Sequence, residues 1–215
     1  MNIFTGYQLS RFGIFPRVVE TLPHIYSAPL LHGNTAHLVN NLIGLMVFSG
    51  LCLLRGIKFY LWSSFIIITL TGLMVWLFAR PAIHIGASGW IFGLWSLTIA
   101  MAWFDHRFIN IVIAVFVIFF YGGMFYGVLP GRPGVSFESH LFGAVAGVIC
   151  ALLTAKTRRY ERVRKRIFRV VLNFSNPHIG IAMLRLEKSA RAPENTALKG
   201  PELENLCKDR VYQSV

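Results

Sequence analysis

The chain has few charged residues, and acidic residues are the scarcest of them. Only 14% of its 215 residues are charged, with nine Asp and Glu against 21 Lys and Arg. Soluble domains of average composition carry about 25% charged residues. Here 55% of the residues are apolar and the mean hydropathy is +0.57. This composition argues against a soluble domain and favours a chain embedded in a membrane.

Cysteine is also rare, and its spacing points to no particular chemistry. Cys52 and Cys150 lie in apolar segments, and Cys207 lies in a polar one. No two of them have the spacing of a disulfide framework or of a metal motif. We interpret all three as free, inert thiols. No cluster of ligand residues predicts a metal, and we expect no organic cofactor.

Long apolar runs, by contrast, are abundant. A bilayer is crossed by roughly 17–25 apolar residues, and five segments come close to that length: 38–54, 59–78, 87–104, 108–126 and 140–155. Because the linkers are short, these helices should pack as sequential neighbours. The predicted fold class is therefore all-α, a polytopic membrane helix bundle with five transmembrane helices visible.

The basic residues predict how this bundle is oriented. A run of Lys and Arg between 156 and 169 follows the last segment, which places its C-terminal end in the cytoplasm. Alternation then places the starts of the first, third and fifth segments near the outer face. We expect a multi-pass protein of the cell (inner) membrane with a cytoplasmic C-terminus.

Three regions follow from this topology. Residues 1–31 form an outer-face segment too short to span, so we expect either an upstream helix before it or an interfacial position, and we favour the former. Residues 32–155 form the membrane domain. Residues 156–215 form a basic tail, in which apolar residues recur at helical spacing: Val163, Ile167, Val170, Val171 and Phe174.

The tail predicts a juxtamembrane amphipathic helix. A basic amphipathic helix beside a membrane span binds most simply to anionic lipids at the inner surface. Topology already explains the net charge of +12, so nucleic acid is not an expected partner.

Ser88 and His140 are the candidate catalytic residues. Each lies at the same end of an apolar segment among small residues, and polar groups at membrane depth usually mark a pathway or a site. A serine hydroxyl is a weak nucleophile until a base removes its proton, and histidine is the usual base. The spacing therefore favours a serine hydrolase with its site inside the bilayer.

Glycines accompany both residues. Gly89 and Gly93 form one small-residue face beside Ser88, and Gly143 and Gly147 form another on the last segment. Small faces allow two helices to approach closely, which would bring serine and histidine within hydrogen-bond reach. The alternative is that both faces serve packing alone and that the serine bonds a backbone carbonyl.

His37 and Asn41 are four residues apart and share one helix face. Both can donate hydrogen bonds to an oxyanion. The alternative is a plain interfacial helix start, capped by Asn34 or Thr35.

His84 lies four residues before Ser88 and is a rival base, but its loop position favours a structural role. His24, His106 and His178 have no partners by spacing, and we interpret them as solvated or interfacial.

These motifs together resemble the rhomboid family of intramembrane serine proteases over about residues 12–155. The resemblance rests on their order and spacing: His32, His37 and Asn41; then Gly86-Ala87-Ser88-Gly89 with Phe92 and Gly93; then His140, Gly143 and Gly147.

The resemblance implies a role for each residue. Ser88 would be the nucleophile and His140 the general base, without a third acid. Asn41, His37 and the Ser88 backbone N–H would hold the oxyanion, and Phe92 would stack on the catalytic histidine.

The remaining motif residues would support the site. Gly86, Gly89, Gly143 and Gly147 are expected to shape it, and the loop 127–139 resembles the family's mobile cap. Rhomboids have six core helices, so the five segments would be helices two to six and the first would be missing.

The expected function is that of an intramembrane serine endopeptidase, which cleaves peptide bonds in or near the transmembrane segments of other membrane proteins. The alternative is a non-catalytic rhomboid-like protein that binds membrane clients, and the intact Ser88 and His140 pair argues against it. A small transporter would predict internal repeats, and none is found.

Overall fold

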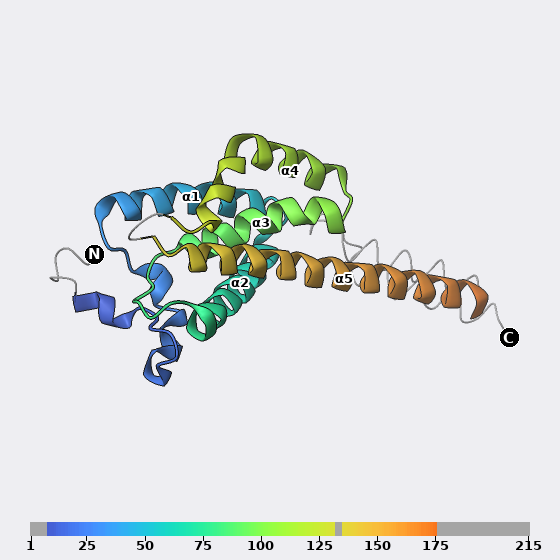
Figure 1. Cartoon of the computed structure of the whole chain (residues 1–215). Helices are drawn as coiled ribbons and strands as arrows, with labels where there is room; N and C mark the ends of the chain where they lie inside the picture. Colours follow the sequence, from blue (N-terminus) through green and yellow to red (C-terminus); the bar gives the residue numbers. More distant parts are fainter. Residues whose placement is uncertain (1–7, 132–134, 176–215) are drawn as a thin grey trace, which may run out of the picture. The chain divides into compact units, whose positions relative to one another are not determined.

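The computed structural model describes residues 8–131 and 135–175, and these are almost entirely helical (Figure 1). Five α-helices are present there: α1 (Thr35–Leu53), α2 (Ile57–Phe78), α3 (Ser88–Phe104), α4 (Phe108–Tyr121) and α5 (Phe137–Ser175). The 3-10 helices are η2 (Gln8–Phe12), η3 (Val19–Ile25), η4 (Ala28–Leu30) and η5 (Gly122–Val128). No strand occurs over this range, and a single β-bridge joins Ile14 to His84. The all-α helix bundle is confirmed.

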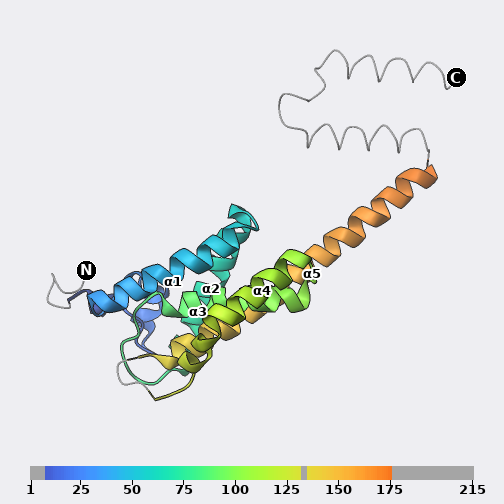
Figure 2. The same ribbon diagram turned by 90° about the horizontal axis from the view of Figure 1, so that it is seen from above.

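Within the described residues, four stretches are long and apolar enough to cross a membrane: Thr35–Leu53, Ile57–Phe78, Phe108–Val128 and Phe137–Thr157. The third apolar helix, α3, is shorter at 17 residues. It lies among α1, α2, α4 and the first half of α5 (Figures 1 and 2). Most of its side chains between Gly89 and Thr98 are buried. Because its neighbours shield it, α3 is the core of the bundle, with Leu94 and Leu97 fully buried.

The fourth helix ends earlier than its apolar run predicts. The run extends to Tyr126, but α4 ends at Tyr121 and the chain continues as the 3-10 helix η5. Gly122 and Gly123 follow at once, and glycine is a poor α-helix former. This tighter turn brings the Gly127 carbonyl toward the last helix.

The N-terminal segment packs against α2. Ile14, Ile25 and Ala28 form a small core with Val75 and Ala79. Helix α2 has a glycine where this segment crosses it, since a Cβ at Gly72 would lie 2.5 Å from Ile25 Cβ. Residues 8–31 thereby hold the end of α2 and the loop that leads into α3.

Helix α5 starts three residues before the expected segment and continues to Ser175. The chain divides into two compact units, Met1–Thr157 and Arg158–Val215. In the second unit Val163 and Ile167 are exposed on the helix. The expected amphipathic pattern continues through Val170, Val171 and Phe174, whose side chains lie outside the described part, as do residues 176–215.

Candidate active site

Helices α3 and α5 meet along a seam of glycines. A Cβ at Gly143 would run into the backbone oxygen of Gly89, and a Cβ at Gly147 would run into that of Gly93. Ser96 Oγ also donates to the Ala144 carbonyl, 2.7 Å away. Side chains at these glycines would push the helices apart, so the seam sets how closely the two helix starts can approach.

Ser88 is the first residue of α3, and it is half-buried. The turn before it depends on Gly86, whose φ of +115° lies in the region that favours glycine. A Cβ there would also lie 2.7 Å from the His37 ring. Gly86 therefore permits both the sharp turn into α3 and the close approach of α1.

His140 lies in the first turn of α5, and two contacts fix its ring. Phe92 stacks on it with centroids 4.1 Å apart and planes 6° from parallel. Its Nδ1 lies 2.9 Å from the Gly127 carbonyl oxygen. Because a carbonyl can only accept, Nδ1 carries the proton, and a neutral ring then has its lone pair on Nε2.

Ser88 and Phe92 are one helical turn apart, so they share a face of α3. Since Phe92 stacks on His140, that face is turned toward the first turn of α5. Among the described residues no hydrogen bond joins Ser88 to His140. Bonds of this kind are commonly long without substrate and tighten in the substrate complex.

Asn41 and His37 approach the turn before Ser88 from α1. Asn41 is only 5% exposed, and its Nδ2 has no hydrogen-bond partner among the described residues. A Cβ at Gly86 would lie 3.4 Å from that nitrogen. A buried donor without a partner costs about 1–3 kcal/mol. Such an unpaired donor is expected where a ligand, rather than the protein, supplies the acceptor.

The start of α1 is capped as the plainer interpretation predicts. Asn34 Oδ1 accepts a 2.8 Å bond from the His37 backbone N–H. His32 packs edge-on against the His37 ring, with centroids 5.2 Å apart. Burial lowers the pKa of His32, and the neighbouring His37 lowers it further. The cap and the site donors coexist, because the cap joins the Asn34 side chain to the His37 backbone N–H. The side chains of His37 and Asn41 are left free to face the site.

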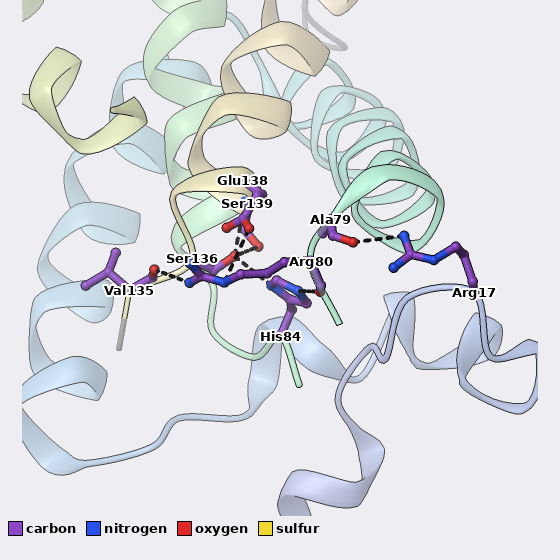
Figure 3. A network of polar contacts seen from close by, with 8 residues as sticks. All are labelled: Arg17, Ala79, Arg80, His84, Val135, Ser136, Glu138 and Ser139. Carbon is purple, nitrogen blue, oxygen red and sulfur yellow. Dashed lines mark hydrogen bonds and ion pairs between the residues drawn. The ribbon is translucent and has the colours of Figure 1, made fainter. Parts of the chain in front are cut away.

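His84 is not available as the base for Ser88. Its Nδ1 lies 2.7 Å from Ser136 Oγ, and its Nε2 lies 3.1 Å from the Arg80 carbonyl (Figure 3). The side chain is buried, and burial lowers the pKa of its ring. With both nitrogens engaged, it has no free nitrogen to take a proton from Ser88.

Sequence reasoning missed several contacts around the site. Away from the site, His24 and His106 do have partners, because His24 Nδ1 lies 3.1 Å from the Gly13 carbonyl oxygen and His106 Nδ1 lies 3.1 Å from that of Ala102. Ser136 and Ser139 were not predicted as part of the site, although a serine just before an apolar run can mark a helix N-cap. The Gly127 carbonyl could not have been found, since no side chain marks a backbone acceptor.

Other expectations concern the cap loop, the thiols and metal ligands. Residues 132–134 of the expected cap 127–139 lie outside the described residues. Cys52 and Cys150 are free and buried, and Cys207 is not described. Over residues 8–131 and 135–175 no three His, Cys, Asp or Glu side chains gather as potential metal ligands.

The chain is similar to a protein-family model and to several known proteins. The protein-family model described as Rhomboid domain matches residues 20–157. An uncharacterised protein of Mycobacterium tuberculosis, Rv1337, is 40% identical over 171 residues, which cover 75% of this chain and 71% of that protein. An uncharacterised protein of Mycobacterium leprae, ML1171, is 36% identical over 170 residues, covering 75% and 67%.

A more distant relative comes from a plant. Rhomboid-like protein 11, chloroplastic, of Arabidopsis thaliana is 30% identical over 145 residues, covering 60% of this chain and 51% of that protein. No solved structure was found to match.

Proposed function

Since the chain belongs to the rhomboid family and has several helices able to cross a membrane, we propose that this multi-pass membrane protein is an intramembrane serine endopeptidase. It hydrolyses peptide bonds in or near the transmembrane segments of other membrane proteins. Ser88 is the nucleophile and His140 the general base.

The observation that carries this proposal is the double anchoring of His140. The Gly127 carbonyl holds the proton on Nδ1, and the Phe92 ring fixes the imidazole plane. Nε2 is then left as the basic atom, and the His140 ring lies against the face of α3 that Phe92 shares with Ser88. In a dyad without a carboxylate, a backbone acceptor can supply the orientation that a third residue gives elsewhere.

The reaction follows from these groups. His140 Nε2 takes the proton from Ser88 Oγ as the oxygen attacks the scissile carbonyl. Asn41 Nδ2, the His37 ring and the Ser88 backbone N–H stabilise the negative oxygen of the tetrahedral intermediate. The histidine then passes its proton to the leaving amine, and water attacks the acyl-enzyme with the same base assisting.

Membrane placement and substrate form part of the proposal. The site end of the bundle, where α1, α3 and α5 begin, lies near the outer face of the cell membrane and admits water. The C-terminal tail is cytoplasmic and binds anionic lipids. Substrate segments enter laterally and partly unwound, because a regular helix shields its carbonyls from attack.

A fluorophosphonate probe tests the proposal on purified protein in liposomes. Wild type should be labelled at Ser88, as located by mass spectrometry, and both Ser88→Ala and His140→Ala should lose labelling. Ser49→Ala is the matched control, because Ser49 lies further along α1, where its Oγ donates to the Tyr60 hydroxyl of α2. This variant should be labelled like wild type. Folded wild-type protein that resists the probe would contradict the proposal and favour the client-binding alternative.

A further inference from the structure

A chain of polar contacts links the loop before Ser88 to the start of the helix that carries His140. His84 Nδ1 lies 2.7 Å from Ser136 Oγ, which lies 2.8 Å from Ser139 Oγ. Ser136 immediately precedes α5, and its hydroxyl also accepts from the Ser139 backbone N–H at 3.2 Å, the arrangement of a helix N-cap. Figure 3 shows these side chains converging from the two segments.

The hydrogen-bonding capacities in this chain all match. The Arg80 carbonyl can only accept, so His84 Nε2 carries a proton and the neutral ring accepts at Nδ1. Ser136 therefore donates to His84 and accepts from both Ser139 groups, which uses its one donor and both lone pairs. A fully satisfied polar chain of this kind favours a single arrangement of its members.

Arg80 forms a second tie between the same two segments. Its Nη2 donates to the Val135 carbonyl at 2.9 Å, and its Nε lies 3.3 Å from Glu138 Oε1. The Glu138 side chain is buried, while that of Arg80 is half exposed. The arginine also lies over the Phe137 ring, 5.7 Å from its centroid. One residue of the α2–α3 loop thus contacts Val135, just before α5, and both Phe137 and Glu138 in its first turn.

We propose that His84 and Ser136 are positioning residues that fix the first turn of α5 against the loop carrying Ser88, with Arg80 and Glu138 as a second clamp. This inference rests on the proposed function, because what the link sets is the approach of Ser88 to His140.

The geometry favours this role over support of the fold alone. Ser136 stands one helical turn before His140, and its carbonyl accepts from the His140 backbone N–H. His84 stands four residues before Ser88. The glycine seam already packs α3 against α5 further along the helices, so the polar link acts where the reacting side chains meet. Misplacement by about 1 Å there can cost about a hundredfold in rate.

The test compares Ser136→Ala with Ser136→Thr, which keeps the hydroxyl, and with Ser49→Ala as control. For each, kcat and KM on a single-span reporter in liposomes and the probe-labelling rate are measured beside the thermal unfolding midpoint. Ser136→Ala should lower kcat and the labelling rate about tenfold, with KM within about twofold of wild type. Ser136→Thr should restore most of kcat, and Ser49→Ala should not change it.

A second variant keeps the proposal testable if Ser136→Ala does not fold. Glu138→Gln preserves the side-chain shape but weakens the clamp with Arg80, and it should lower kcat about threefold at unchanged KM. Suppose that wild type cleaves the reporter. The proposal is then overturned if every one of Ser136→Ala and Glu138→Gln that folds keeps the wild-type kcat, or if these variants change KM alone. Failure of folded wild type to cleave or label would instead overturn the proposed function itself.

Discussion

The two ends of the bundle differ in how far their buried asparagine side chains are hydrogen-bonded. Where α1 and α3 end, Asn110 Oδ1 accepts from both Nε and Nη2 of Arg55 at 3.0 and 2.9 Å. Asn110 Nδ2 donates to the Asp105 carbonyl at 2.7 Å, and Arg107 pairs with the Asp105 carboxylate at 3.6 Å. This paired end joins the α1–α2 turn to the α3–α4 turn.

Where α1, α3 and α5 begin, donors are left over. Asn41 Nδ2 and His32 Nε2 are buried without a hydrogen-bond partner among the described residues. Two asparagines of one bundle thus have opposite surroundings. A satisfied asparagine stabilises the fold, whereas an unsatisfied donor beside a candidate nucleophile is poised for charge that develops during reaction.

Replacing each asparagine by alanine in a separate variant gives the largest expected contrast between loss of activity and loss of stability. Asn41→Ala should lower kcat about 10²–10³-fold, because it removes the proposed oxyanion donor, and should leave the unfolding midpoint near that of wild type. Asn110→Ala should lower the free energy of unfolding by about 1–3 kcal/mol while kcat per folded molecule stays unchanged. Reporter cleavage and thermal unfolding are measured on both. Equal losses of stability in the two variants would erase the distinction between the ends.

The glycine seam offers the next largest effect. Gly143→Ala places a methyl group against the Gly89 backbone and should lower kcat about a hundredfold by separating the helix starts. It should also destabilise the protein by about 1–3 kcal/mol. Gly50→Ala in α1 is the control, since nothing lies within 4 Å of its Cβ position. An active Gly143→Ala variant with wild-type stability would show that the seam does not set the site.

Stacking on His140 should matter less. Phe92→Leu keeps an apolar side chain but removes the parallel ring, an interaction of about 0.5–1.5 kcal/mol. The rate of probe labelling at Ser88 should fall about threefold to tenfold. Phe48→Leu, which removes a fully buried ring from the core, should lower stability without this loss of labelling rate per folded molecule. An unchanged labelling rate in Phe92→Leu would show that the Phe92 ring does not orient His140 for reaction.

Acid should have the smallest effect, and it should come from the site end. Burial lowers the pKa of His32 and His84 below the ordinary value of 6.5, so the unfolded chain binds more protons than the folded one as the pH falls through that value. Their contribution to stability is therefore present above about pH 6.5 and is lost below it. Unfolding midpoints measured from pH 8 to pH 5 should decline on the acid side.

The control for this pH series is again a pair of variants. His84→Asn should flatten the acid decline, whereas Asn110→Ala should keep the slope of wild type at a lower midpoint. A decline of the same steepness in His84→Asn would assign the acid sensitivity to other groups.

Much of the fold could be predicted because apolar runs and their charged or proline ends mark membrane helices. Helix α2 ends at Phe78 as expected, before Arg80 and Pro81. Helix α4 ends at Tyr121, before the apolar run does, because Gly122 and Gly123 change the helix type inside that run. The spanning stretch Phe108–Val128 still covers the expected segment 108–126. That Ser88 and His140 lie at the same end of the bundle could be predicted, since Ser88 begins α3 and His140 lies in the first turn of α5.

The contacts that hold those residues could not be read in the same way. At the site end, His84 bonds Ser136 across 52 positions. At the opposite end of the bundle, Arg55 bonds Asn110 across 55. Such pairs depend on the paths of loops, and helical periodicity carries no information about them. The paired end was missed entirely, because one asparagine at the start of an apolar segment has no partner visible in sequence.

The most direct test of the account is cleavage of a single-span reporter in liposomes, with the cut located by mass spectrometry. The reporter carries small residues and a helix breaker in its span. Wild type and Asn110→Ala should cut in or near the span, and Ser88→Ala and Asn41→Ala should not do so at a comparable rate. Cleavage by Ser88→Ala at the wild-type rate, or none by folded wild type, would contradict the assignment of the site end as a protease active site.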